Sequence, residues 1–443
     1  MSRRSRKKLP AEPVELVIDD LSHDGRGVAT HEDKRVFVRR VLPGERVRVR
    51  ITARKRRYDE GEVLEILEAS PDRIEPRCPH FGLCGGCSLQ HLDSARQIEY
   101  KHNTLVQNLT RIGKVVPAAW WAPLSGPAWG YRRKARLSVR HVRRKERVLV
   151  GFRETYGRFV ADMQECHVLD PRVATQLPKL SALIHAMEAR ETIPQIEVAC
   201  GDASCALVFR HLEELCANDL KMLREFAQTS GLAVLLQPGG PGTIHPLQPE
   251  SVDLSFRLAD FGLELAFGPS DFIQVNAAMN NRMIARALEL LNPGPRDRVL
   301  DLFCGLGNFT LPIATRAAEV VGVEGDAALI RKATDNAARN DIRNAHFHLA
   351  DLNAEPGAAP WLQGGYDAVL IDPPRSGAEF ILPHVAASGA HRVVYVSCHP
   401  ASLARDAGIL VQEYGFRLAG AGVMDMFPHT GHVESIALFE LDR

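Results

Sequence analysis

The stretch Val299-Leu300-Asp301-Leu302-Phe303-Cys304-Gly305-Leu306-Gly307-Asn308-Phe309-Thr310 decides the fold of the C-terminal part of the chain. It predicts a buried strand that enters a glycine turn and continues into a helix. Glycines let a ligand approach the backbone closely, and a helix N-terminus favours a negative group. Because dehydrogenases share such a turn, it indicates a cofactor site without identifying the cofactor.

Further apolar segments alternate with helical ones at residues 320–323, 346–349, 368–371 and 393–396. This alternation predicts a parallel sheet covered by helices on both faces. Glu324, Asp351 and Asp372 each end one of these segments, and strand ends meet at one edge of such a sheet. Glu324 suits the hydroxyls of an adenosine ribose, and Asp351 can accept from an adenine amino group. The alternative is that these acids are only helix caps.

Cys398 follows the segment at 393–396 after Ser397 and precedes a helical pattern that starts near Ala401. A helix N-terminus can lower a thiol pKa below its usual value of about 8.5, and the thiolate is the nucleophile. Core packing is an equal alternative for Cys398 and for Cys304. A thiolate beside a cofactor site favours addition to carbon-6 of a pyrimidine, which makes carbon-5 reactive toward a methyl donor.

Such a reaction needs a general base to remove the carbon-5 proton. Glu434 lies just before the apolar segment 436–439, where it would return to the sheet edge. His429 and His432 are the competing candidates. A pyrimidine within folded RNA would have to be unstacked into the site.

Cysteines cluster in the middle of the chain, where Cys78, Cys84 and Cys87 stand close together around two glycines. Cys166 is the best fourth candidate because it follows a basic hairpin. Four thiolates suit either zinc or an iron–sulfur cluster, and spacing leaves both open, beside the alternative that no metal binds. Cys200, Cys205 and Cys216 lie in patterns typical of buried packing residues.

The N-terminal residues 14–67 show short alternating segments separated by Gly and Pro. They predict a five-stranded closed barrel of the oligonucleotide-binding type. Arg46, Arg48 and Arg50 alternate with apolar residues and would face outward.

The 443 residues, 45% hydrophobic and 25% charged, predict a multidomain globular chain. We expect domains at 10–69, 75–264 and 265–443, with a middle topology that the pattern does not resolve. There is no apolar run of about 18 residues and no apolar stretch after the basic start, so we expect a cytoplasmic protein without a membrane partner. For such a chain a disulfide framework is not expected from its nine cysteines.

The net charge of +1 conceals an uneven distribution. Residues 1–57 hold 17 Lys and Arg against 8 Asp and Glu, and residues 130–160 hold 11 against 2, so each segment carries +9 and the remainder −17. Basic segments of this kind predict contacts with nucleic acid phosphates.

Four motifs together resemble the S-adenosylmethionine-dependent RNA uracil-carbon-5 methyltransferases. They are the stretch from Asp301 to Thr310, Asp372-Pro-Pro-Arg-Ser-Gly, Ser397-Cys398 and His429-Thr-Gly-His-Val-Glu434. The resemblance covers essentially the whole chain, and its N-terminal part is similar to a TRAM domain. Related cytosine methyltransferases would carry a cysteine where this chain has Arg375, which favours uracil.

The resemblance implies a multidomain α/β fold with a TRAM barrel, a central α+β domain and a Rossmann-like methyltransferase domain. It implies Cys398 as nucleophile and Glu434 as base. S-adenosylmethionine would lie among Gln274, Phe303, Asn308, Glu324, Asp351 and Asp372. A 4Fe-4S cluster would be held by Cys78, Cys84, Cys87 and Cys166.

The presence of both a TRAM domain and a cluster is similar to the bacterial branch that methylates 23S ribosomal RNA, and we expect the chain to act on that RNA as a monomer. Two other classes remain as alternatives. One is an RNA-binding assembly factor without turnover, and the other is an oxidoreductase that uses the cluster for electron transfer.

Overall fold

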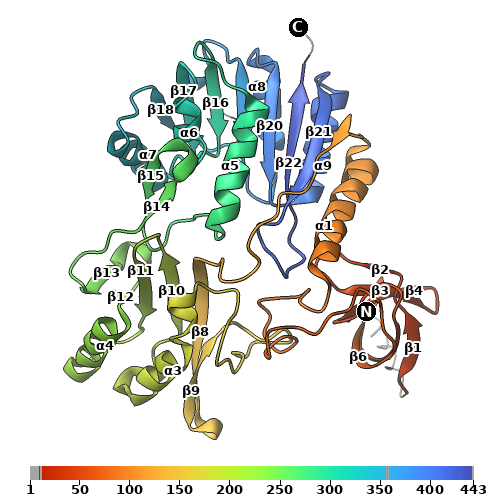
Figure 1. Cartoon of the computed structure of the whole chain (residues 1–443), viewed down its shortest axis with the longest axis vertical. Helices are drawn as coiled ribbons and strands as arrows, with labels where there is room; N and C mark the ends of the chain where they lie inside the picture. Colours follow the sequence, from red (N-terminus) through yellow and green to blue (C-terminus); the bar gives the residue numbers. More distant parts are fainter. Residues whose placement is uncertain (1–8, 10–11, 356, 358, 442–443) are drawn as a thin grey trace, which may run out of the picture. The chain divides into compact units, whose positions relative to one another are not determined.

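An eight-stranded sheet organises the C-terminal part of the computed structural model, which describes residues 9, 12–355, 357 and 359–441 (Figure 1). The strand order is β18-β17-β16-β19-β20-β22-β21-β7, with β18 to β20 parallel and β22 antiparallel to β20. The strands are β7 (Ala119–Trp120), β16 (Arg298–Leu302), β17 (Glu319–Glu324), β18 (Ala345–Leu349), β19 (Ala368–Ile371), β20 (Arg392–Ser397), β21 (Arg417–Met424) and β22 (Glu434–Glu440).

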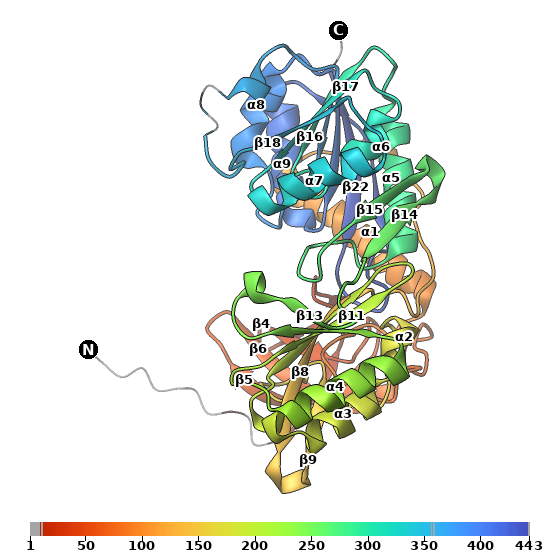
Figure 2. The ribbon, with the colours of Figure 1, turned by 90° about the vertical axis from the view of Figure 1, so that its left-hand side faces the viewer.

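Helices cover both faces of this sheet, which confirms the Rossmann-like expectation. Figure 2 shows α8 (Leu382–Ala387) and α9 (Pro400–Gln412) on one side, with α5 (Ala277–Leu291) and α6 (Thr310–Ala314) on the other. The inner strands β19 and β20 are almost entirely buried, because both of their faces pack against helices. Another helix, α7 (Ala327–Arg339), follows β17 and packs against β17 and β18.

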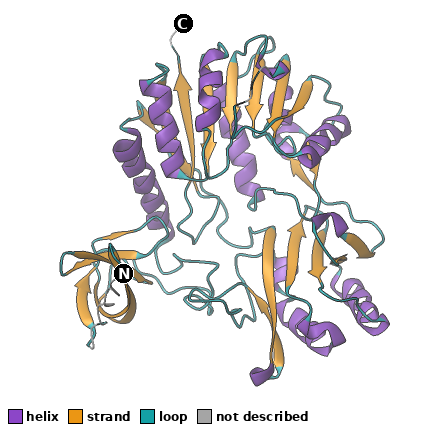
Figure 3. Ribbon diagram, turned by 180° about the vertical axis from the view of Figure 1, so that it is seen from behind, coloured by secondary structure: helices purple, strands orange, loops and turns teal. Residues whose placement is uncertain are grey.

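A second sheet, in the middle of the chain, has the order β13-β12-β11-β10-β8-β9 (Figure 3). Its strands are β8 (Lys134–Val142), β9 (Arg147–Gly151), β10 (Gln195–Cys200), β11 (Cys205–Arg210), β12 (Ala233–Gln237) and β13 (His245–Gln248). The helices of this region are α2 (Pro171–Ala174), α3 (Leu177–Ala186) and α4 (Ala217–Ser230). A separate hairpin, β14 (Ser255–Leu258) and β15 (Leu263–Ala266), leads to the C-terminal sheet.

The N-terminal sheet has six strands in the order β1-β5-β6-β4-β3-β2, not the five that the sequence predicts. The additional strand is β2 (Asp20–Leu21), which is too short to give a pattern. The others are β1 (Val14–Val17), β3 (Gly27–His31), β4 (Lys34–Arg39), β5 (Arg46–Arg54) and β6 (Tyr58–Glu68). Along β5, exposed and buried residues alternate, so Arg46, Arg48 and Arg50 do face outward as expected.

The predicted basic surface of this sheet needs correction, because β6 adds carboxylates. Arg46 pairs with Glu68 at 2.6 Å and Arg48 with Glu65 at 2.7 Å. Residues 10–69 hold 12 Lys and Arg against 13 Asp and Glu, a net charge of −1. Of the +9 counted over residues 1–57, residues 1–8 supply +5 and lie outside the described residues, and the five acids at 59–68 outweigh the remaining +4.

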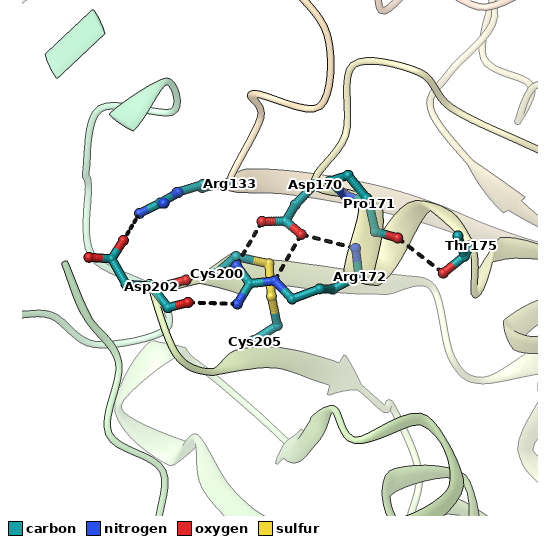
Figure 4. The surroundings of a disulfide bond; sticks show 9 residues. Arg133, Asp170, Pro171, Arg172, Thr175, Cys200, Asp202 and Cys205 are labelled. Carbon is teal, nitrogen blue, oxygen red and sulfur yellow. Dashed lines mark hydrogen bonds and ion pairs between the residues drawn. A yellow bond between two sulfur atoms is a disulfide. The ribbon is translucent and has the colours of Figure 1, made fainter. Parts of the chain in front are cut away.

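The middle of the chain contains a disulfide that the sequence analysis did not expect. Cys200 and Cys205 face each other across β10 and β11 and are bonded (Figure 4). Both residues are buried, as their pattern indicates, but sequence spacing does not reveal that they are directly opposed. Beside them, Asp170 accepts hydrogen bonds from the Arg172 guanidinium, at 3.0 Å from Nε and 2.8 Å from Nη2.

The described residues form two compact units. The first contains the residues up to Lys101 with Glu154–Arg158 and Phe427–His432, and the second contains His102–Arg153, Phe159–Met426 and the residues from Val433 onward. α1 (Ser94–Asn108) passes from one unit into the other. Among the described helices, none has the length and apolar character needed to cross a membrane.

Candidate active site

The glycine turn after β16 adopts a conformation that few residues tolerate. Phe303, Gly305 and Gly307 have φ values of +63°, +57° and +93°. Such values suit glycine, but a bulky residue adopts them only when its surroundings impose them. Asn336 of α7 supports the turn, since its Nδ2 donates to the Leu306 carbonyl at 3.2 Å. The backbone around Phe303 is therefore held in a defined shape at the end of the strand.

Asn308 is fixed by a partner that the sequence analysis did not identify. Its side-chain amide exchanges two hydrogen bonds of 2.9 Å with the buried Asn280 of α5. Two amides paired in this way satisfy each other and lose their rotational freedom. The signal in the sequence is a polar residue on the otherwise apolar face formed by Met279, Met283 and Ile284.

Glu324 and Asp351 stand at the ends of adjacent strands. Glu324 is the last residue of β17, and its Oε2 accepts from the Gly305 N–H at 3.1 Å. The carboxylate thus already contacts the glycine turn. Asp351 follows β18, is exposed and accepts from the Asn353 N–H at 2.9 Å.

Two carboxyl groups lie at this sheet edge, Asp301 completely buried and Asp372 half-buried. Burial raises the pKa of Asp372, which follows β19, to about 7. Burial also raises the pKa of Asp301 to about 8, and the nearby charges of Asp372 and Glu324 add to this effect. Asp301 accepts from the Thr310 hydroxyl, while its Oδ1 has no hydrogen-bond partner among the described residues.

Hydrogen bonds that involve residues of α9 and β20 fix the loop that follows Asp372. Asp406, completely buried, accepts from the Tyr395 hydroxyl at 2.6 Å and from the Ala378 N–H at 2.7 Å. Arg405 donates from Nη2 to the Ser376 carbonyl at 2.8 Å. These residues were missed by the sequence analysis, although an acid within the apolar face of a helix is a detectable signal.

Cys398 and Glu434 lie at the ends of neighbouring antiparallel strands. Ser397 ends β20 and pairs with Ser435, the second residue of β22. Cys398 comes directly after Ser397, and Glu434 comes directly before Ser435, so both lie next to this pair. Glu434, expected just before the apolar segment 436–439, is therefore itself the first residue of β22. The carboxylate is buried, and its charge acts on the Cys398 thiol.

The expectation of a lowered pKa for Cys398 is wrong. Burial and the carboxylates of Glu434 and Asp372 raise the pKa of this thiol to about 11, while Arg375 lowers it. Helix α9 does begin at Pro400, but its His399 cap accepts from the Ser402 N–H at 3.3 Å and so partly satisfies the helix end. Two carboxylates outweigh what remains of the helix dipole.

The sequence analysis also named Cys304 as an alternative cysteine and His429 and His432 as alternative bases. Cys304 is buried, and burial raises its pKa well above the ordinary value, which indicates packing. His429 belongs to the first unit, where its backbone N–H donates to Gln97 Oε1 at 2.9 Å. The ring of His432 contacts Phe427 with 5.4 Å between ring centroids.

The proposed cluster ligands are divided between the two units. Cys78, Cys84 and Cys87 lie on a turn of the first unit, where the Gly86 N–H donates to Cys84 Sγ at 3.4 Å. Gly82, with a φ of +89°, allows this turn to close. Cys166 is buried in the second unit.

Asp170, Cys200 and Cys205 form another group whose potential ligand atoms lie within 4.8 Å of one another. The two sulfurs are bonded to each other, and the carboxylate is occupied by Arg172, so this group is not a metal site in the disulfide form (Figure 4).

Comparisons with known proteins agree with this arrangement. The model of the tRNA (uracil-5-)-methyltransferase family matches residues 93–358 and 363–441, and that of the TRAM domain matches residues 8–64. A 23S rRNA (uracil(1939)-C(5))-methyltransferase RlmD of Xanthomonas euvesicatoria is 54% identical over 440 residues, 99% of both chains. The RlmD of Alkalilimnicola ehrlichii is 54% identical over 438 residues, 99% of this chain and 98% of its own.

A solved structure shares the fold at much lower identity. The Pyrococcus abyssi tRNA (uracil-54, C5)-methyltransferase in complex with S-adenosyl-L-homocysteine superposes with a TM-score of 0.74 and 22% identity, covering 96% of this chain and all of that one. The family match and the relatives of near-complete coverage show that this chain is a methyltransferase of the RNA uracil-C5 family with an N-terminal TRAM domain.

Proposed function

We propose that the protein transfers a methyl group from S-adenosylmethionine to carbon-5 of one uridine in 23S ribosomal RNA. The observation that carries this proposal is the placement of Cys398 and Glu434 beside the Ser397–Ser435 pair of β20 and β22, where the charges of Glu434 and Asp372 act on the Cys398 thiol. A nucleophile and a base side by side at the carboxyl edge of a methyltransferase sheet suit a reaction that adds a thiolate and later removes a proton. Relatives named as 23S rRNA methyltransferases support the choice of RNA.

In the proposed reaction, the Cys398 thiolate adds to carbon-6 of the uracil ring, and the ring electrons form an enolate with a nucleophilic carbon-5. Carbon-5 then takes the methyl group of the sulfonium, which leaves as the neutral thioether. Glu434 removes the carbon-5 proton, the carbon-6–sulfur bond breaks, and the thiolate is released. The ring returns to aromatic uracil with one methyl group added.

S-adenosylmethionine supplies the electrophilic methyl group, and the residues at the sheet edge fit its parts. Glu324 offers a carboxylate for the ribose hydroxyls, and the shaped turn at Phe303 lies beside it. Asp351 would accept from the adenine amino group. Gln274, Asn308 and Asp372 complete the proposed cofactor contacts.

The proposed 4Fe-4S cluster would be held by Cys78, Cys84, Cys87 and Cys166. The structure supports the donor set in two ways: the turn at Gly82 is tight, and the Gly86 N–H donates to Cys84 Sγ, as backbone groups do toward cluster sulfurs. In the proposed reaction no electron is transferred, so the cluster would hold the chain together in this region. Its presence is tested by iron and sulfide analysis of protein purified without oxygen, with each Cys→Ser variant losing both.

We propose that the chain is divided into three domains. The TRAM domain at residues 10–69 would bind RNA, the central domain at 75–264 would carry the cluster, and the domain at 265–443 would catalyse methyl transfer. The protein would act as a monomer in the cytoplasm, where ribosomal RNA is modified. In this proposal, RNA is the only macromolecular partner.

Methyl transfer to defined RNAs tests the proposed function. Ribosomal RNA from cells that lack the gene is incubated with the protein and S-adenosylmethionine, and modified nucleosides are mapped by mass spectrometry. The proposal predicts 5-methyluridine at one position of 23S RNA and none in transfer RNA treated in the same way. Methylation of transfer RNA alone, or of a ring nitrogen, would contradict it.

A further inference from the structure

The segment Gly268–Val275 connects β15 to α5 and carries Gln274. Ile273 and Val275 are buried, whereas Phe272 is 73% exposed and Gln274 is half-buried. Alternate residues of an extended segment point to opposite sides, so the two apolar side chains anchor it and the other two face outward. In the described part of the chain, the Gln274 side chain makes no hydrogen bond, so its position depends on how the segment is held.

An ion pair from α7 holds the first half of this segment. Lys332 contacts Asp271, which is only 11% exposed and also accepts from the Gly268 N–H. A Cβ atom added at Gly268 would lie 2.5 Å from Lys332 Nζ. The ammonium therefore occupies the space that any other side chain at this position would need.

A second lysine contacts the same segment, and it belongs to β8 of the central sheet. Lys134 Nζ donates to the Pro269 carbonyl, and burial lowers the pKa of this amine. The neighbouring Arg133 N–H donates to the Val275 carbonyl at 2.9 Å. Both ends of the segment are thus attached to neighbouring residues, Lys134 at the start of β8 and Arg133 directly before it.

We propose that Lys332 and Lys134 are positioning residues for the cofactor site: through Asp271 and Pro269 they place Gln274 relative to the helix that follows Glu324. The inference rests on the proposed role of Gln274 in holding the cofactor. Because α7 begins shortly after Glu324, one ion pair joins the two segments expected to contact S-adenosylmethionine.

The test measures S-adenosylhomocysteine binding to the full-length protein by calorimetry. Lys332→Met is expected to weaken binding about 10-fold and to raise the KM for S-adenosylmethionine similarly, with kcat at saturation changed less than about 2-fold. Lys332→Arg should restore most of the affinity. Arg331→Met, at the exposed neighbouring position on α7, is the matched control and should bind as wild type.

A double variant shows whether the lysine acts through Gln274. Gln274→Ala should weaken binding, and adding Lys332→Met to it should cause little further loss, because the residue to be placed is gone. Wild-type affinity in Lys332→Met, additive losses in the double variant, or an equal loss in Arg331→Met would overturn the proposal. If Lys332→Met does not fold, Lys134→Met and Asp271→Asn are compared with Gln274→Ala in the same way.

Failure of this inference is distinguishable from failure of the proposed function. Cofactor binding is measured without RNA, so it decides the role of the lysines even if no uridine is methylated. Conversely, a protein that methylates 23S RNA and is insensitive to Lys332→Met would retain the proposed function and refute the positioning role.

Discussion

The reactivity of Cys398 depends on the carboxylates beside it. With a pKa of about 11, its thiol is protonated at neutral pH. The positive sulfonium of a bound S-adenosylmethionine would oppose the charges of Glu434 and Asp372 and so favour the thiolate. The thiol is therefore expected to be more reactive beside the bound cofactor.

Removing the charge of Glu434 should make Cys398 more reactive. In Glu434→Gln the pKa of the thiol falls, so a larger thiolate fraction is present at pH 8 and alkylation by iodoacetamide is several-fold faster. Peptide mass spectrometry reports the rate at Cys398 separately from that at Cys304, which should stay slow in both proteins. Slower alkylation of Cys398 in the variant would contradict this account.

The buried carboxyl of Asp301 should make stability fall as pH rises. In the unfolded chain this group ionises near its ordinary pKa of 3.8, whereas in the folded protein it stays protonated up to about 8. Its pKa is raised by folding, so the free energy of unfolding decreases between these two values. Asp301→Asn should therefore raise Tm relative to wild type more at pH 8 than at pH 5.

Thermal unfolding at several pH values measures this difference, with Asp335→Asn, at an exposed position of α7, as control. The control should give no gain that grows with pH. A constant Tm difference for Asp301→Asn across the range would show that Asp301 is not held protonated by the fold.

Single residues show where sequence reasoning succeeds and fails. The locations of Cys398, Glu324 and Asp372 at strand ends follow from the apolar pattern, because such ends can be read directly. The raised pKa of Cys398 could not be predicted, since the pairing of β20 with β22 that brings Glu434 to it is a long-range contact.

At the scale of elements, α5 supports the glycine turn through one amide pair. Asn280→Leu would leave the polar atoms of the half-buried Asn308 side chain without their partner, at a cost of at most about 1–3 kcal/mol, the value for a buried group. We expect weaker S-adenosylhomocysteine binding, by roughly 10-fold. Calorimetry measures this effect.

The matched control is Asn281→Leu, because the Oδ1 of Asn281 makes no hydrogen bond in the described part of the chain. Cofactor affinity in this variant should remain near that of wild type. Equal losses in both variants would indicate a general disturbance of α5 rather than removal of the amide pair with Asn308.

The elements themselves were predicted to different degrees. The predicted strand at 368–371 coincides with β19, and the others in the parallel part differ by one or two residues. The pattern could not show that β7 joins the sheet from far away in the sequence, nor that Cys200 and Cys205 are opposed, because both depend on pairing between strands.

At the scale of the whole molecule, charge has to be counted by surface and not by segment. The arginines of β5 are paired with acids of β6, whereas Arg140 and Arg144 in the β8–β9 hairpin are exposed and have no ion-pair partner among the described residues. Unpaired arginines release phosphate counterions on binding RNA, and paired ones must first leave their carboxylates.

Arg140→Ala combined with Arg144→Ala should therefore weaken RNA binding and lower the salt slope of log K by about 1 for each phosphate that is no longer bound. The paired residues Arg46 and Arg48 serve as control, with smaller effects expected from Arg46→Ala and Arg48→Ala. Filter binding between low and moderate salt measures both. A larger decrease in the control pair would place the main RNA-binding surface on the N-terminal sheet instead.

The most direct test of the central claim uses RNA that contains 5-fluorouridine at the target position. Fluorine cannot leave as a cation, so after methyl transfer the Cys398–carbon-6 bond should persist and give a covalent protein–RNA complex on a denaturing gel. The account predicts this complex with wild type and S-adenosylmethionine, and its absence in Cys398→Ala. A complex that forms equally in Cys398→Ala would show that another residue is the nucleophile.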